Sequence, residues 1–252
     1  MFSPPGEGRT FTACRIVRLG DVLPSGGARL DGVARWLQDV AADDLRDAGV
    51  EGEVAWVVRR TAVAVTRRPR YGRPVELTTW CSGTGMSWAE RRTTVTDDAG
   101  VAAEGVALWV ALDPKQLRPV VVEERFSSMW GEQARSRRVR SRLIHPRPPA
   151  AGTTDRALAL RLADLDLIGH VNNAIAFAVV EEEITRLIPD AIVSFAEVEY
   201  RVPIEMGASV TVRTAVGDGG LRCWLVDGAG APLASAQVRI ERFLPPSLPA
   251  GN

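Results

Sequence analysis

The side chains most able to do chemistry stand close together in one run, DLDLIGHVNN, at positions 164–173. Asp166 and His170 offer a carboxylate and an imidazole, which act in enzymes as general bases or nucleophiles. Asp164 precedes them, and Asn172 and Asn173 follow; asparagine is a preferred residue at helix starts. Each residue taken singly is more often a cap or a solvated loop residue. The combination is what indicates a site.

The segment after this run predicts the element that would hold it in place. Apolar residues recur at helical spacing from Ala174 onward, so a helix is expected over 174–188. The first N–H groups of a helix have no intrahelical acceptor and lie at the positive end of its dipole. An oxyanion formed beside Asp166 and His170 would therefore be stabilised there.

The composition narrows the class of protein. The 252 residues are 46% hydrophobic and 25% charged, which is ordinary for a soluble globular protein. The formal net charge is zero, and no aromatic residues interleave the arginine-rich stretch 135–147, so nucleic-acid binding is disfavoured. No run approaches the roughly 18 apolar residues needed to span a bilayer, and no signal peptide is evident. We expect a cytoplasmic protein without membrane insertion.

Cysteine and histidine are too sparse for a metal centre or a disulfide framework. Cys14, Cys81 and Cys223 are odd in number and far apart, and His145 and His170 are the two histidines. Neither histidine lies near a cysteine or in an HExxH arrangement. We therefore expect a reduced protein with no metal and no cofactor.

The order of predicted elements repeats along the chain. A helix over 29–48 is followed by four strand-like runs, then by a stretch rich in arginine and proline in which a short helix is expected over 122–132. The helix over 174–188 is again followed by four strands. Short echoes recur in the same order: RLGD (18–21) and RLAD (161–164), PRYG (69–72) and IEMG (204–207), DDAG (97–100) and DGAG (227–230). Repetition at a long period indicates a duplicated structural unit.

A long helix followed by an antiparallel meander is typical of the hot-dog fold, in which a sheet wraps around one helix. We expect an α+β tandem hot-dog whose two sheets join edge to edge and so cover edges that would otherwise be exposed. The expected ranges are 11–117 for the first domain, 118–153 for the linker and 154–244 for the second. The corresponding turn of the first domain, DVLPSGGARLD, has no histidine or asparagine, so this half should be structural or hold substrate.

The chain resembles the acyl-[acyl-carrier-protein] thioesterases over about 11–243. The resemblance in the first half lies in Trp56 to Val58 with Arg60, Pro69 with Gly72, and Thr79 with Trp80. In the second half it lies in DLD at 164–166, HVNN at 170–173, Glu182 and EYR at 199–201. It implies hydrolysis of a fatty acyl thioester on acyl carrier protein, with the first domain holding the acyl chain and the second catalysing.

The resemblance also implies a site made of an Asp, an Asn two residues on, a His two further, and a Glu after EYR. Asp166 and His170 match this pattern, whereas Ile168 stands at the Asn position and Pro203 at the Glu position. Glu205 is two residues beyond Pro203 and would share its strand face, so it is a candidate substitute. The motif is also similar to that of single-domain hot-dog acyl-CoA thioesterases, in which the second aspartate is catalytic.

We accordingly expect Asp166 to be the general base or nucleophile of thioester hydrolysis. His170 would position water or the substrate carbonyl, and Asn172 and Asn173 would fix the loop and the start of the helix. Backbone N–H groups there would form the oxyanion hole. Two alternatives stay open: an acyl-CoA thioesterase, and a non-catalytic acyl-thioester binder, favoured by Ile168 and Pro203.

The remaining candidates concern substrate binding. Trp36 and Trp56 are core residues that would also wall an acyl tunnel. Glu182 is a solvated residue of an acidic run, or ties the two halves together. Carrier proteins are acidic, so a basic docking surface is expected, for which the candidates are Arg135, Arg137, Arg138, Arg140, Arg142, Arg67, Arg68 and Arg70. A tandem hot-dog is already a pseudo-dimer, so a monomer and a homodimer are both possible.

Overall fold

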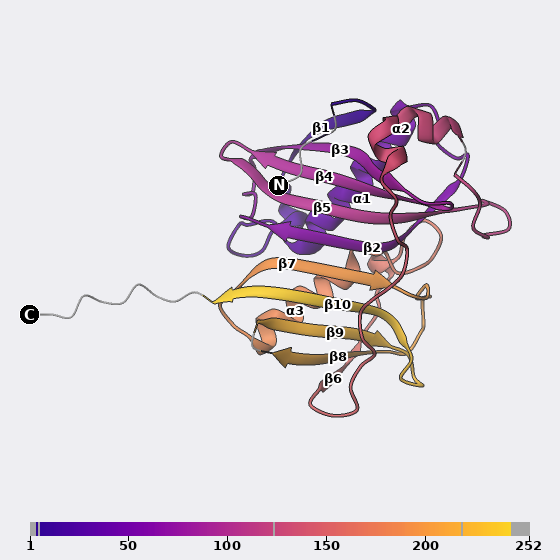
Figure 1. Cartoon of the computed structure of the whole chain (residues 1–252). Helices are drawn as coiled ribbons and strands as arrows, with labels where there is room; N and C mark the ends of the chain where they lie inside the picture. The colour runs from indigo at the N-terminus through magenta and orange to yellow at the C-terminus, as the bar shows by residue number, and fades with distance from the viewer. Residues whose placement is uncertain (1–3, 5, 123, 218, 243–252) are drawn as a thin grey trace, which may run out of the picture.

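The computed structural model describes residues 4, 6–122, 124–217 and 219–242. One antiparallel sheet of ten strands runs through the molecule in the order β1-β3-β4-β5-β2-β7-β10-β9-β8-β6 (Figure 1). Two helices, α1 (Leu30–Asp47) and α3 (Ile175–Leu187), lie against one face of this sheet, one in each half. The tandem hot-dog expected from the sequence is confirmed.

The two halves contain the same elements in the same order. The first half consists of β1 (Thr10–Ile16), a 3-10 turn η1 (Leu19–Asp21), α1, β2 (Ala55–Val65), β3 (Pro74–Thr84), β4 (Trp88–Asp97) and β5 (Gly100–Leu112). The second consists of β6 (Thr154–Leu158), η2 (Leu162–Asp164), α3, β7 (Ala191–Tyr200), β8 (Val210–Gly217), β9 (Gly220–Val226) and β10 (Pro232–Arg242). Residues 243 and 244 of the expected second domain lie outside the described residues.

The halves join where β2 pairs with β7. The two strands are antiparallel, with Arg60 opposite Glu199 at one end of the ladder and Ala64 opposite Phe195 at the other. This pairing covers one edge of each five-stranded sheet, which would otherwise present unpaired backbone groups. The sheet is thus continuous across the junction, as the sequence predicted.

The helices are held by apolar stripes that face the sheet. In α1 the buried residues fall at helical spacing and include Val33, Leu37 and Val40. In α3, Phe177 and Val180 are at most 1% exposed, and both helices belong to one apolar core shared by the two halves. The two helices also contact each other, so the shared core fixes α3 against α1.

Backbone hydrogen bonds show that the sequence echoes are true structural equivalents. The N–H of Leu23 donates to the Gly27 carbonyl at 2.8 Å, and the N–H of Asp166 donates to the His170 carbonyl at 2.7 Å. Both turns follow matching 3-10 turns, η1 and η2. Leu23 of the first half therefore occupies the place of Asp166, and Gly27 the place of His170.

The equivalence extends to the strands that follow. Ala28 N–H donates to the Pro69 carbonyl, and Val171 N–H donates to the Ile204 carbonyl, each at 2.8 Å. PRYG and IEMG thus occupy matching positions. The first half lacks the carboxylate and the imidazole of the second at this site, so the duplicated fold carries one polar cluster.

The segment between the halves forms a helix and then an extended strap. Helix α2 (Glu124–Ser136) packs on β3, somewhat beyond the helix expected over 122–132. The strap is fixed by the 0% exposed carboxylate of Glu199, which accepts the N–H groups of Ile144 at 2.6 Å and His145 at 3.1 Å. His145 also lies 3.0 Å from Glu197.

His145, Glu197 and Glu199 form the one group found among the described residues whose ligand atoms are close enough to hold a metal ion. Arg201 lies 3.2 Å from Glu199 and Arg60 lies 3.8 Å from Glu197, so arginines already balance these carboxylates. The cluster holds the strap against the sheet through hydrogen bonds to Ile144 and His145. In the part of the chain that is described, no helix is both long and apolar enough to cross a bilayer.

Candidate functional site

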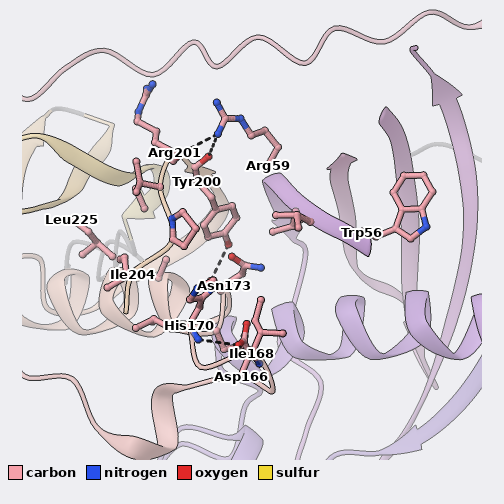
Figure 2. A pocket seen from close by; sticks show the side chains of 18 residues that line it. Trp56, Arg59, Asp166, Ile168, His170, Asn173, Tyr200, Arg201, Ile204 and Leu225 are labelled. Atoms are coloured by element: carbon pink, nitrogen blue, oxygen red, sulfur yellow. Dashed lines mark hydrogen bonds between the residues drawn. The ribbon is translucent and has the colours of Figure 1, made fainter. Parts of the chain in front are cut away.

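A cavity of about 240 Å³ opens where the ends of β2 and β7 meet the loop before α3 (Figure 2). Asp166, His170, Asn172 and Asn173, which the sequence singled out, all line it. The other side is formed by residues of β2, β7 and β10 with the segment after β7, among them Val58, Arg59, Tyr200, Arg201, Ile204 and Ala234. The structure therefore brings four of the five expected catalytic residues to one hollow that both halves line.

Asp166 is held in a tight turn by its own carboxylate. Its Oδ1 accepts the N–H of Ile168 at 3.0 Å and the N–H of His170 at 3.1 Å. Gly169, with φ of 81°, supplies the left-handed residue that closes the turn. No described residue donates to Oδ2, so this oxygen is available to a water or a substrate. The His170 imidazole likewise has no hydrogen-bond partner among the described side chains.

The start of α3 leaves one backbone donor free. Asn172 Oδ1 accepts the N–H of Ala174 at 2.9 Å. The N–H groups of Ile175, Ala176 and Phe177 donate to carbonyls three residues earlier, in 3-10 fashion. In the run 172–177, the N–H of Asn173 is the one for which the described residues offer no acceptor. The oxyanion hole expected from several helix amides is thereby reduced to a single backbone donor.

Tyr200, which the sequence reasoning did not assign, holds the residue that carries this donor. Its hydroxyl donates to the Asn173 carbonyl at 2.9 Å (Figure 2). Burial raises the pKa of Tyr200, so the group stays a protonated donor. Tyr200 belongs to the EYR element of the family resemblance, so the sequence marked it as a residue of interest. The sequence did not show that its hydroxyl contacts Asn173.

The first half contributes Arg59 to the same wall. Its Nη1 donates to the carbonyls of Tyr200 and Arg201 at 3.0 and 3.1 Å, across the β2–β7 junction. The Arg201 side chain donates to the His145 carbonyl at 3.1 Å and so connects the wall with the strap. Two arginines therefore stand at a cavity whose other described lining is mostly apolar.

Three predicted site residues lie elsewhere. Trp36 is 4% exposed in the first-half core and lines neither this cavity nor the second one described below, because its face of α1 points toward β1 and β3. The Glu182 side chain is 65% exposed and lies 3.2 Å from Arg156 on the outer face of α3. Glu205 pairs with His170 through the backbone, but it is exposed and its carboxylate does not line the cavity.

The acidic residue that ties the halves together is Glu181. Its Oε2 accepts the N–H of Leu30 at 3.0 Å, and Arg68 Nη2 lies 2.6 Å from its Oε1. Burial raises the pKa of this carboxyl, although Arg68 and the Leu30 N–H oppose the shift. The role considered for Glu182 thus belongs to its neighbour, since the rotation of α3 buries position 181 and exposes position 182.

The two departures from the family pattern both face the cavity. Ile168 and Pro203 line it, where the resemblance implies an amide and a carboxylate. Ile168 is 71% exposed and its neighbour Leu167 is fully exposed, so the tip of the loop is apolar. The chemistry available here consequently rests on Asp166, His170 and the Asn173 N–H.

A second cavity of about 230 Å³ lies between α1, α2 and the first-half sheet. Its lining is largely apolar and includes Leu45, Trp56, Trp109 and Trp130. Trp56 lines both cavities, and its ring lies about 6 Å from those of Phe126 and Trp130. Trp56 therefore stands beside an apolar space, and its role as a wall of an acyl tunnel stays a prediction.

The arginines considered for docking divide into two groups. Arg137 donates to Ser82 and Glu90, Arg67 to Asp97, and Arg68 to the Ala28 carbonyl, so these three stabilise the fold. Arg135 lies 3.9 Å from Glu132 of the same helix. The other four candidates are exposed and have no ion-pair partner among the described residues. They are Arg70, Arg138, Arg140 and Arg142, of which the last three precede the strap residues that contact Glu199 and Arg201.

Comparison with known proteins identifies the family. The family model of the acyl-ACP thioesterase N-terminal domain matches residues 8–130, and that of the acyl-ACP thioesterase C-terminal domain matches residues 149–239. The chain belongs to the acyl-ACP thioesterase family. Membership makes it a thioester hydrolase acting on fatty acyl thioesters.

Relatives of this thioesterase are found in bacteria and plants. An uncharacterized protein of Mycobacterium tuberculosis is 29% identical over 226 residues, covering 89% of this chain and 90% of the relative. The dodecanoyl-[acyl-carrier-protein] hydrolase of Cinnamomum camphora is 26% identical over 244 residues, covering 87% of this chain and 63% of the plant protein.

Solved structures share the fold. The 12:0-ACP thioesterase of Umbellularia californica aligns with a TM-score of 0.77 at 22% identity, over 92% of this chain and 97% of that one. An acyl-ACP thioesterase of Bacteroides thetaiotaomicron aligns with a TM-score of 0.76 at 16% identity, over 92% and 98%. At these identities the likeness concerns the arrangement of the ten-stranded sheet and its helices.

Proposed function

We propose that this thioesterase hydrolyses fatty acyl chains carried on acyl carrier protein, with Asp166 as the general base or nucleophile. The observation that carries the proposal is that two groups without a hydrogen-bond partner among the described residues line one cavity: the Oδ2 of Asp166, which receives no donor, and the N–H of Asn173, which finds no acceptor. Hydrolysis needs both: a group that activates water or attacks the carbonyl, and a donor for the oxyanion.

In the general-base form of the reaction, Asp166 Oδ2 accepts a proton from water as the water oxygen bonds to the thioester carbon. The carbonyl oxygen becomes an oxyanion and accepts the Asn173 N–H. When the oxyanion collapses, the C–S bond breaks and the thiolate leaves with the proton from Asp166. The His170 imidazole holds the water or the carbonyl. The acyl chain extends past Trp56, which lines both cavities, into the second cavity, whose lining is largely apolar.

The carrier is proposed to dock on the strap. Arg138, Arg140 and Arg142 are exposed without carboxylate partners among the described residues, and the strap next contacts the cavity-lining Arg201. An acidic carrier protein would meet positive charge close to the cavity, which favours its association at low salt. This surface favours the carrier protein over coenzyme A as the acyl donor.

The decisive experiment compares wild type with Asp166→Asn on the same acyl chain, carried by the protein and by coenzyme A. Asparagine retains the oxygen that accepts the Ile168 and His170 N–H groups, so the loop is preserved. Loss of the base should lower kcat by about 100-fold or more. Equal rates for the two proteins would refute the role of Asp166. Binding of acyl thioester by the wild type without turnover would instead support a binding protein, consistent with Ile168 and Pro203 in the cavity.

A further inference from the structure

The repeat relates Gln38 of α1 to Glu181 of α3. The two helices bury residues in the same register, so that Val33, Ala34, Trp36 and Leu37 match Ala176, Phe177, Val179 and Val180. Gln38 and Glu181 each follow the last of these by one position. Leu30, the first residue of α1, matches Asn173 in the same register.

In the first half, the equivalent of the free donor is already occupied. Glu181 reaches from α3 to the start of α1, and its Oε2 accepts the Leu30 N–H at 3.0 Å. This N–H corresponds to that of Asn173. A carboxylate oxygen thus occupies, in the non-catalytic half, the place where a reaction oxyanion would bind in the catalytic half. The contact shows that the N–H at this position of the fold can donate to an anionic acceptor from the other half.

At the equivalent place in the second half, Gln38 reaches from α1 of the first half to the start of α3. Its Nε2 lies 3.4 Å from Asn172 Oδ1, one residue before the free Asn173 N–H. A primary amide carries two N–H donors. The contact with Asn172 uses one and leaves the other available. Gln38 also lines the second cavity, so its side chain stands between the acyl space and the start of α3.

Glu181 carries a charge and Gln38 does not, and the residues beside them differ accordingly. Glu181 is balanced by Arg68, whose Nη2 lies 2.6 Å away. The residue matching Arg68 in the second half is Pro203, because Pro69 and Ile204 are equivalent. Gln38 therefore has no equivalent of the Arg68 guanidinium at this position. A neutral donor, unlike a carboxylate, is compatible with an oxyanion at this position.

We propose that Gln38 is a catalytic residue whose Nε2–H and the Asn173 N–H together form a two-donor oxyanion hole, one donor from each half. The inference rests on the proposed hydrolysis at Asp166. As water adds to the thioester carbon, the carbonyl π electrons move to oxygen, and both N–H groups donate to that oxyanion. The charge returns when the C–S bond breaks. The first half thereby takes part in catalysis, although it lacks a carboxylate and imidazole of its own.

The test replaces Gln38 and measures kcat and KM separately on an acyl carrier protein thioester. Gln38→Leu removes the donor at similar size, and loss of one oxyanion-hole donor lowers kcat by about 100- to 1000-fold. KM should change little, because the ground-state carbonyl uses the donor weakly. Gln38→Glu should be at least as inactive, since its carboxylate would accept the Asn173 N–H as Glu181 accepts that of Leu30.

Glu181→Gln is the matched control, because it makes the related change at the equivalent position of the other half. It should alter the melting temperature while leaving kcat within about threefold, as it removes no donor used by the reaction. Circular dichroism and melting curves of the Gln38 variants establish that they are folded. If Gln38→Leu is unfolded, the folded Gln38→Glu variant decides the question.

The outcomes separate this inference from the proposed function. Gln38→Leu with kcat within threefold of wild type, beside an inactive Asp166→Asn, overturns the role of Gln38 alone. A raised KM at unchanged kcat also overturns it and assigns Gln38 to acyl-chain binding. A wild type that binds but does not hydrolyse acyl thioesters overturns both, because no oxyanion then forms.

Discussion

Trp56 lines both cavities, and its removal should change which acyl chains the enzyme prefers. Trp56→Ala deletes an indole that packs against Phe126 and Trp130 at the junction of the two spaces. The cavities of about 240 and 230 Å³ would then communicate more widely. We expect the variant to accept longer chains than the wild type, because methylene groups would occupy the space that the indole filled.

The size of the effect follows from apolar burial. Each buried methylene contributes about 0.8 kcal/mol, and about 1.36 kcal/mol corresponds to a tenfold change in rate. Each added methylene that fits should therefore raise the ratio of kcat/KM in the variant to that in the wild type about fourfold. Two such groups give about 15-fold. Trp56 is half-buried, so the loss of stability should fall below the ~3–5 kcal/mol of a fully buried tryptophan.

The assay is a panel of saturated acyl chains of increasing length on one carrier, measured for wild type, Trp56→Ala and Trp88→Ala. Trp88 lines neither cavity, and its Nε1 donates to the Val139 carbonyl. It therefore controls for the loss of a tryptophan as such. A length profile that falls uniformly in Trp56→Ala, without moving toward longer chains, would refute the path of the acyl chain past this residue.

Three further outcomes are expected. Burial raises the pKa of the 0% exposed Glu183, but hydrogen bonds from Arg186, Arg156 and Thr214 outweigh it and leave that pKa below its ordinary 4.5. Its contribution to stability is therefore complete above pH 4.5 and lost as pH falls through the lowered value. Glu183→Gln should lower the free energy of unfolding by about 3 kcal/mol at neutral pH. Urea unfolding of both proteins should show this difference becoming smaller in acid. A difference that does not change with pH would contradict the ion-paired role of Glu183. Reversing Arg138 and Arg140 to Glu should raise KM for the carrier-protein substrate several-fold at low salt and leave the coenzyme A substrate unchanged; a salt-independent KM in the wild type speaks against docking there. Cys14 is exposed, whereas burial raises the pKa of Cys81 and Cys223 to about 12, so a thiol reagent should modify only Cys14 in the native protein, as mass spectrometry can verify.

Local patterns predicted the elements closely. Apolar spacing indicated a helix over 174–188, and α3 spans Ile175–Leu187; the first helix was expected over 29–48 and α1 spans Leu30–Asp47. Four strands follow each helix, as the alternation of Val, Thr and Trp indicated. These features are readable because they depend on neighbours within a few residues. Asp166 and His170 were found for the same reason, since their turn is local.

Contacts between the halves were not readable in this way. Gln38 meets Asn172 across 134 positions, and Leu30 meets Glu181 across 151. Which of three consecutive glutamates faces the other half depends on the rotation of α3 in the core, and an acidic run does not reveal that rotation. The free N–H of Asn173 emerges only when the acceptors of all its neighbours are known. The apolar character of Trp36 fits the core and a tunnel equally well, so the sequence alone could not place it.

The ladder between β2 and β7 has a consequence for how this enzyme can change. In a symmetric pair of identical chains, replacing the aspartate of the loop by leucine would disable both sites at once. Covalent fusion removes that constraint, so Leu23 and Gly27 can stand in one copy while Asp166 and His170 persist in the other. The first-half residues that line the second cavity can then change without any change at Asp166 and His170.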